Sequence, residues 1–197
     1  MGDFIRMVPQ VTLEQFHAFR DERPKEEKWE LIAGVPHMMP PPRLIHQRIA
    51  GNLEALLNER LRFVKPGWRA DREIGLLLPE DDTFNPEPDV TVIDTEIGID
   101  QLYADRFYFV AEVLSPHDKA RVLALKLQYY QGHDLCRGVL FVEPDRIAAV
   151  LHARDPGWLA LQLTAPDDRI VTSEIGDIGS LGQLYRHTPL WKPEFGG

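Results

Sequence analysis

The sequence predicts a mixed α/β fold of the α+β type, in which a β-sheet is flanked by helices and followed by a C-terminal β-meander. Apolar residues at helical spacing over 44–61, and the apolar runs 107–114 and 138–142, are typical of an amphipathic helix and two buried strands. Short apolar runs separated by turns occupy 147–173. Because 197 residues suffice for one domain with a substantial core, we expect a single domain over 1–197.

A helix and a hairpin are expected in the N-terminal part of the chain. Thr12 opens a Thr-x-x-Gln capping box, which predicts that a helix begins there. Residues 28–33 and 35–39 are typical of two strands joined by a turn at Gly34. The three prolines at 40–42 then end the hairpin, because proline cannot donate to a β-ladder.

A long helix and the strands of a sheet are expected next. Apolar residues three and four apart predict the helix over 44–61. Apolar runs predict strands at 73–78, 90–93 and 107–114, and a second helix follows over 119–131. Four further strands are expected at residues 138–142, 147–152, 158–163 and 170–173.

Composition limits the classes of protein to which the chain can belong. With 44% hydrophobic and 27% charged residues it has the composition of a soluble globular protein. Cys136 is the sole cysteine, which excludes an intrachain disulfide framework and argues against a cysteine-based zinc site. The first residues form no apolar signal-peptide region, and no window approaches the ~20 apolar residues of a membrane span. We therefore expect a cytoplasmic protein that has no membrane partner.

The distribution of charge bears on nucleic-acid binding. A formal net charge of −9 argues against a strong DNA-binding protein. Residues 43–72, however, contain seven basic and three acidic residues, a net charge of +4 against −13 for the rest of the chain. Arg43 and Arg48, at the start of the long helix, are candidate DNA contacts. The pattern predicts weak, salt-dependent DNA binding on one face.

Two charged residues interrupt apolar patterns. Glu112 is the sole ionisable residue in the run 107–114, and a buried carboxylate is costly unless it is paired, protonated or bound to a cation. Lys126 lies within the apolar stripe of the next helix, which a short turn joins to this strand, so the two side chains could face each other. A partly solvated Glu112 and a Lys126 that reaches the helix rim are the alternatives.

Three more polar residues are candidates on weaker grounds. Asp89 stands where a loop enters a strand, and Glu30 interrupts the first strand, although strand alternation could place it in solvent. His46 lies in the first turn of the long helix, where a packed core histidine is the alternative. Carboxylates on neighbouring strands are oxygen ligands of the kind that Mg²⁺ prefers, and a nearby lysine can offset charge on a phosphoryl group.

The order of these candidate residues along the chain, Glu30, His46, Asp89, Glu112 and then Lys126, resembles that of the Uma-two family of restriction endonucleases. This family is a branch of the PD-(D/E)XK nuclease superfamily. The resemblance runs from about residue 12 to residue 185. Its carriers are the segments 29–34, 38–40, 45–47, 88–90, 112–116 and 126–130. The Glu-Val-Leu-Ser-Pro block, with a lysine eleven residues after its serine, is the more specific part, whereas a bare Pro-Asp pair is not specific.

The resemblance implies a restriction endonuclease-like core and a Mg²⁺-dependent endonuclease that hydrolyses DNA with an activated water, with Mn²⁺ as a possible substitute. The implied site consists of the metal ligands Asp89, Glu112 and the backbone carbonyl near Val113, the catalytic lysine Lys126, the additional acidic residue Glu30, and the accessory His46. Cleavage of both strands of a duplex generally requires two active sites, which implies a homodimer.

The chain departs from the family pattern at two places. Val122 stands where relatives tend to carry Asp, and the aromatic residue usual before the later strand is absent around residues 137–139. Two other functions stay open, the first because of Val122 and the acidic surface, and the second because the same ligands would serve it. One is a catalytically weak or inactive nucleic-acid-binding or assembly module on a nuclease fold, and the other is a metal-dependent hydrolase of small phosphate compounds.

Overall fold

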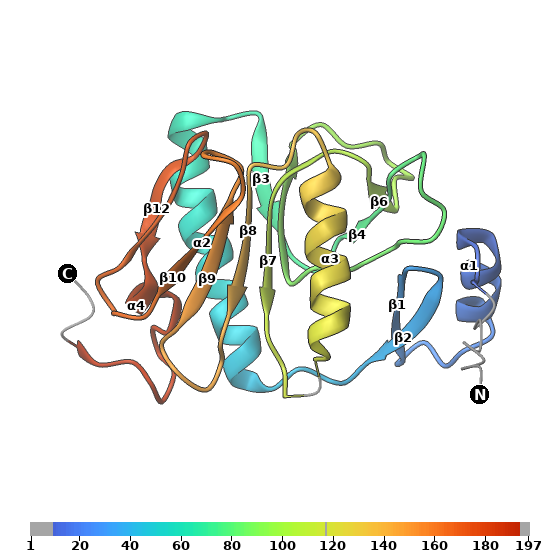
Figure 1. Cartoon of the computed structure of the whole chain (residues 1–197), viewed down its shortest axis with the longest axis horizontal. Helices are drawn as coiled ribbons and strands as arrows, with labels where there is room; N and C mark the ends of the chain where they lie inside the picture. The colour runs from blue at the N-terminus through green and yellow to red at the C-terminus, as the bar shows by residue number, and fades with distance from the viewer. Residues whose placement is uncertain (1–9, 117, 194–197) are drawn as a thin grey trace, which may run out of the picture.

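A six-stranded mixed sheet forms the centre of the computed structural model, which describes residues 10–116 and 118–193 (Figure 1). The strands follow the order β10-β9-β8-β7-β5-β3, and all neighbours are antiparallel except β7 and β8. Their bounds are β3 Trp68–Asp71, β5 Val90–Asp94, β7 Phe107–Val113, β8 Gly138–Val142, β9 Ala149–Ala153 and β10 Leu159–Leu163.

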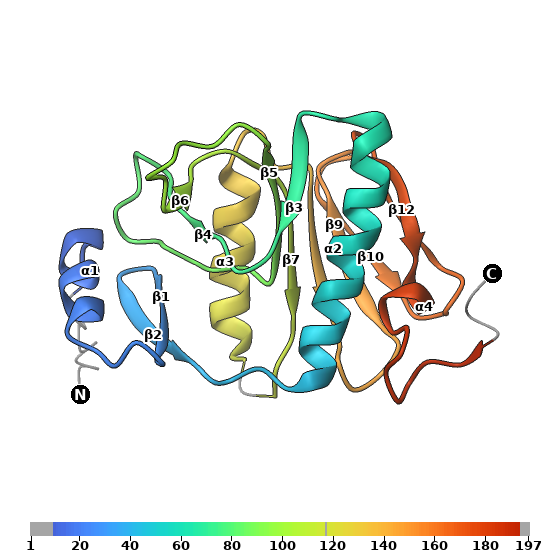
Figure 2. The same ribbon diagram turned by 180° about the vertical axis from the view of Figure 1, so that it is seen from behind.

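Two long helices cover opposite faces of this sheet. In Figure 1 α3 lies in front of the sheet and α2 behind it, and Figure 2 shows the reverse. Helix α3 is the crossover that the parallel pair β7–β8 requires. It therefore begins just after the end of β7. The helices are α1 Leu13–Asp21, α2 Leu44–Val64, α3 Ala120–Gly132 and α4 Leu181–Leu184.

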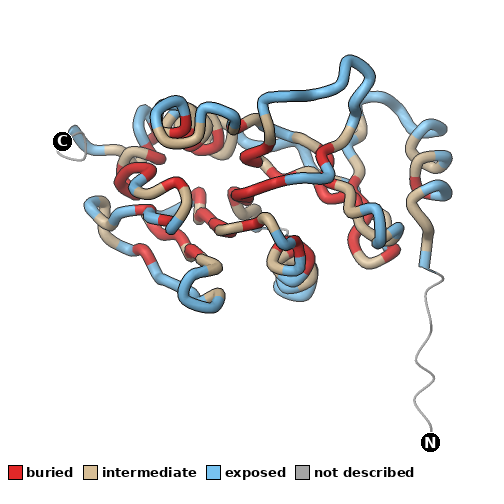
Figure 3. The backbone as a smooth tube through the Cα atoms, turned by 90° about the horizontal axis from the view of Figure 1, so that it is seen from above, coloured by how far each residue is buried: buried red, intermediate tan, exposed pale blue. Residues whose placement is uncertain are grey.

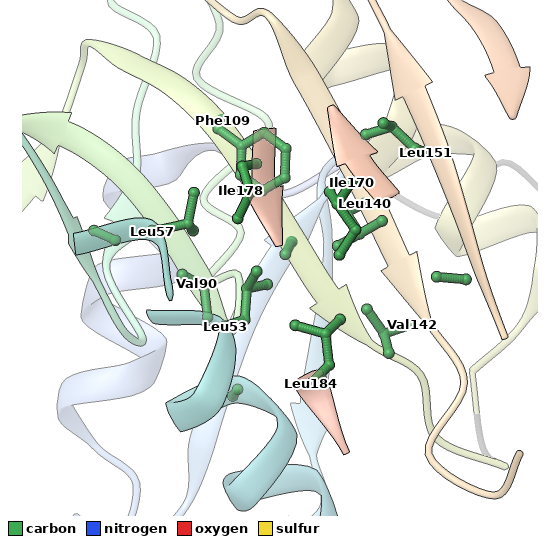
Figure 4. Packing of buried hydrophobic residues seen from close by; sticks show 14 of the residues in the cluster. Leu53, Leu57, Val90, Phe109, Leu140, Val142, Leu151, Ile170, Ile178 and Leu184 are labelled. Carbon is green, nitrogen blue, oxygen red and sulfur yellow. The ribbon is translucent and has the colours of Figure 1, made fainter. Parts of the chain in front are cut away.

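The larger hydrophobic core lies between the sheet and α2 (Figure 4). Leu53 and Leu57 of α2 are fully buried against Val90 and Phe109 of the sheet. Each such side chain contributes about 1.5–3 kcal/mol through removal from water. Figure 3 shows that buried residues follow the sheet and the inward sides of the helices, whereas α1 alternates between exposed and partly buried residues, with Phe16 buried.

Three two-stranded sheets surround the central one: β1 Lys28–Ile32 with β2 Val35–Met39, β4 Gly75–Leu76 with β6 Tyr103–Ala104, and β11 Arg169–Thr172 with β12 Gly176–Ser180. The β1–β2 turn requires glycine at Gly34, whose φ is +72° and where a Cβ atom would lie 2.8 Å from the Cβ of Gln10. None of the helices in the described part of the chain is long and apolar enough to cross a membrane.

Most expected elements form close to their expected bounds, with instructive differences. The strand expected at 73–78 is reduced to Gly75–Leu76, and β3 was not expected, because it has only four residues and two of them, Arg69 and Asp71, are charged. Of the meander expected over 147–173, β9 and β10 are antiparallel neighbours in the central sheet, but β11 pairs with β12 outside it. Tertiary pairing decides the place of such short strands.

Tyr185 fixes the β8–β9 turn from the C-terminal side. Its hydroxyl lies 2.6 Å from the carbonyl oxygen of Glu143, 2.8 Å from that of Arg146 and 3.1 Å from that of Ala148. The amide of Ala148 also donates to this hydroxyl, over 3.2 Å. The residue that follows α4 therefore holds the turn between two strands of the central sheet.

Candidate active site

A pocket of about 420 Å³ opens where the beginning of β5, the end of β7 and the N-terminal ends of α2 and α3 meet the β1–β2 hairpin. Its lining includes five of the residues expected from the sequence, Glu30, His46, Asp89, Glu112 and Lys126, together with Val113 and Arg43. Residues far apart in the chain thus converge on one recess.

Lys126 occupies the floor of this pocket between two carboxylates. Its Nζ lies 2.9 Å from Oε2 of Glu30 and 3.1 Å from Oε1 of Glu112. Tyr130 adds a third contact, because its hydroxyl donates to the same Glu112 Oε1 over 2.6 Å. Glu30, Glu112 and Lys126 are only 5%, 7% and 4% exposed. A buried charge that is paired and hydrogen-bonded in this way can persist away from water.

Each of these side chains owes its position to its secondary structure. Lys126 and Tyr130 are one helical turn apart on α3, so both project from one face of the helix towards Glu112 on β7. Glu30 comes from β1, which contacts α3 across the pocket. The hairpin thus shields Glu30 from water, and the alternative that placed Glu30 in solvent is wrong.

Asp89 lies at the side of the pocket, held by two donors. The backbone amide of Val113 donates to its Oδ2 over 2.7 Å, and Nε2 of His46 lies 2.6 Å from its Oδ1. The antiparallel register pairs Val90 with Ala111. Extended by one residue, that register places Asp89 opposite Glu112, so the two carboxylates meet at the same end of neighbouring strands.

Burial and the charges of neighbouring side chains shift the pKa values of Glu112, Lys126 and His46. Burial, reinforced by Glu30 and Asp89, raises the pKa of Glu112 to about 7, against the opposing effects of Lys126 and Tyr130. Burial alone would lower the pKa of Lys126, but the carboxylates of Glu112 and Glu30 outweigh it and raise that pKa. The ammonium group therefore stays charged at neutral pH. His46 behaves similarly: burial lowers its pKa, but the carboxylates of Asp89, Glu112 and Asp118 together raise that pKa above its usual value.

The donor set suits a hard divalent cation with few protein ligands. In the described chain, no three His, Cys, Asp or Glu side chains form a ready-made metal cluster. Mg²⁺, however, usually takes one or two carboxylates and completes its octahedron with water and substrate phosphate. Lys126 and Tyr130 both occupy Oε1 of Glu112, and Asp89 uses one lone pair of each oxygen, so both carboxylates keep acceptor capacity. The residues present therefore fit such an ion.

The expected DNA contacts take part in other interactions. Arg43 lines the pocket and forms a two-pronged ion pair with Asp145, with N···O distances of 2.9 and 3.0 Å. Arg48 donates to the backbone carbonyl of His187 over 2.6 Å. Val122, where the family resemblance implied an Asp, also lines the pocket. It adds no acceptor there, and the carboxylates of the floor remain in place without it.

Three residues of the site were missed from the sequence. Tyr130 was expected only as the end of the segment 126–130 that carries the resemblance, although its position four residues after Lys126 places it on the same helix face. Glu87 lines the pocket, and burial raises its pKa. His37 lies directly opposite Glu30 in the β1–β2 ladder, and burial lowers its pKa. The cross-strand position of His37 follows from the hairpin register and could have been found from the turn at Gly34.

Known structures identify the fold class first. The chain is similar to a solved protein from Anabaena variabilis described as "a putative nuclease belonging to DUF820", with a TM-score of 0.70 and 17% sequence identity over 89% of this chain and 97% of the other. At this identity the similarity establishes a shared fold, a mixed sheet flanked by helices. A comparison with curated proteins finds no match.

The family follows from the sequence comparison. The model of the Uma2 family, described as "Putative restriction endonuclease", matches residues 13–176. The chain therefore belongs to the Uma2 family, and the resemblance noted in its motifs is confirmed.

Proposed function

We propose that this protein is a Mg²⁺-dependent endonuclease that hydrolyses phosphodiester bonds in DNA. The observation that carries the proposal is the buried Lys126 between Glu30 and Glu112, with Asp89 across the same pocket. Three carboxylates and a lysine in a recess are costly to maintain for stability alone, since an apolar core of similar volume is often equally stable. Family membership makes nuclease chemistry the first expectation for such a site.

Each residue has a distinct role in this proposal. Asp89, Glu112 and the carbonyl of Val113 would hold the ion, and Mn²⁺ would be accepted in its place. When bound, Mg²⁺ would polarise the phosphate and make water a better nucleophile. Lys126 keeps its proton and so offsets charge that develops on the phosphoryl oxygens. His46 orients Asp89 through its 2.6 Å contact.

The experiment is a cleavage assay on end-labelled DNA with Mg²⁺, with Mn²⁺ and with EDTA. Wild type is expected to cleave only with metal, and Asp89→Asn and Lys126→Met are expected to abolish cleavage. Lys25→Met is a matched control for Lys126→Met, because Lys25 is exposed and lies outside the pocket lining. Cleavage that survives Asp89→Asn, or that proceeds in EDTA, would refute the assignment of these residues.

A further inference from the structure

The groups that would act on the phosphate lie at the bottom of a recess. Lys126, Glu30 and Glu112 are 4–7% exposed, so a phosphodiester must pass between the pocket walls to approach them. One wall is β2 with residues 40–43, which we call the proline strap, and the other consists of residues 114–116 and 118–119, before α3. In Figures 1 and 2 the proline strap runs past the N-terminal end of α3 on its way to α2.

Both walls carry apolar side chains. Met38, which is 59% exposed, and Met39 line one side together with the prolines of the strap, and Leu114 and Val122 line the other. These apolar side chains can contact the faces of unpaired bases and sugars, which are stacked and enclosed in an intact duplex.

The cations of the lining are mostly committed to carboxylates. Lys28 forms an ion pair with Glu73, and Arg43 forms one with Asp145. Duplex DNA carries one negative charge per ~1.7 Å of its axis, whereas a single strand has half as many phosphates along a comparable length. A chain of net charge −9 with so few unpaired cations at the recess therefore repels the duplex more strongly.

The stiffness of duplex DNA, like its charge, favours binding of a single strand in the pocket. The persistence length of duplex DNA is about 50 nm, and bending a short site sharply costs on the order of 1–6 kcal/mol. To place one backbone between the proline strap and residues 114–116 and 118–119, a duplex would have to bend sharply. A single strand bends freely and can place one phosphate on the floor while its bases lie against the walls.

We propose that the pocket takes an unpaired strand, single-stranded DNA or an unpaired stretch within a duplex, in preference to intact duplex. This inference rests on the proposed nuclease function and names its substrate form. An unpaired strand needs only one active site for its cleavage, so this substrate does not require the homodimer that two-strand cleavage implies.

The test presents one sequence in three forms: single strand, perfect duplex, and duplex with an internal unpaired loop. Cleavage is measured with Mg²⁺, and binding is measured separately by fluorescence anisotropy in EDTA. We expect cleavage of the single strand and, in the third substrate, at the loop, together with tighter binding of the single strand. Equal or faster cleavage of the perfect duplex, or equal or tighter binding of it, would overturn the strand preference.

Variants on one strand provide the matched control. Met38→Glu adds a negative charge to the pocket wall and should weaken single-strand binding about tenfold, because like charges brought together cost free energy. Val35→Glu adds the same charge on β2 at a residue that is 36% exposed and outside the pocket lining, and should leave binding unchanged. Equal effects of the two variants would count against the pocket as the strand's binding site.

The two proposals can fail separately. Absence of cleavage on every substrate in Mg²⁺ and Mn²⁺ would refute the nuclease function, while the anisotropy data would still decide the strand preference. Mononucleotides that compete with the labelled strand as well as an unlabelled oligonucleotide does would overturn the preference in favour of a small phosphate substrate.

Discussion

Removal of the Tyr130 hydroxyl tests how much its hydrogen bond to Glu112 contributes to the stability of the protein. The hydroxyl donates to Oε1 of Glu112 over 2.6 Å, beside Lys126 at 3.1 Å, and Tyr130 is fully buried. A hydrogen bond to a charged group contributes about 1.5–3 kcal/mol. Tyr130→Phe removes this bond while preserving ring volume, so the free energy of unfolding should fall by about that amount. At about 2–4 °C per kcal/mol for a chain of this size, the melting temperature should fall by roughly 3–12 °C.

The adjacent Tyr129 is the matched control. It is 6% exposed, and in the described structure its hydroxyl makes no hydrogen bond to the site carboxylates. Tyr129→Phe should therefore lower the free energy of unfolding much less than Tyr130→Phe does, because it removes no hydrogen bond to a charged group. Guanidinium denaturation of both variants, monitored by circular dichroism, provides the comparison. Equal stability of the two variants would refute the argument.

The loss in Tyr130→Phe should also depend on pH. The hydroxyl opposes the rise in the pKa of Glu112, which is about 7, so its removal raises that pKa further. A carboxyl group whose pKa is raised in the folded state binds more protons there than in the unfolded chain, where its pKa is about 4.3. Stability therefore declines as pH rises between these values, and the deficit of the variant should be larger above pH about 7 than in acid.

Two further predictions concern buried groups. Lys126→Met leaves Glu30 and Glu112 without their cation and should cost about 3–5 kcal/mol at neutral pH. This loss should shrink in acid as the unpaired carboxylates take up protons, and a pH-independent loss in denaturant titrations would contradict the ion-pair account. Cys136 is fully buried, and burial raises the pKa of its thiol to about 12, so a thiol reagent should modify it only after unfolding. Rapid labelling of the native protein would show that this side chain is accessible.

The parts of the site that follow a local rule could be predicted from the sequence. Lys126 departs from an apolar helical stripe, and Glu112 departs from an apolar strand, so each was visible against the pattern of its own element. Their contact was expected because a short turn connects the two elements. The structure brings their charged atoms to 3.1 Å.

The parts that depend on tertiary packing could not be predicted in this way. The alternation of β1 left open whether Glu30 faces solvent, because the packing of the hairpin against α3 is not encoded in a period of two. The hydrogen bond between Tyr130 and Glu112 needed both the helix phase and the distance from α3 to β7. The pairing of β11 with β12, outside the central sheet, likewise depends on contacts with α2 and α4.

The attachment of Tyr185 to the β8–β9 turn connects the end of the chain with the mouth of the pocket. That turn contains Asp145, whose carboxylate accepts two hydrogen bonds from Arg43 at the end of the proline strap. Tyr185 does not line the pocket, yet it stabilises one of the pocket walls through the β8–β9 turn. A fragment that ended before α4 would keep every candidate catalytic residue. It would lose the hydrogen bonds of Tyr185 that position the β8–β9 turn, and with them the support for the Arg43–Asp145 ion pair at the end of the proline strap.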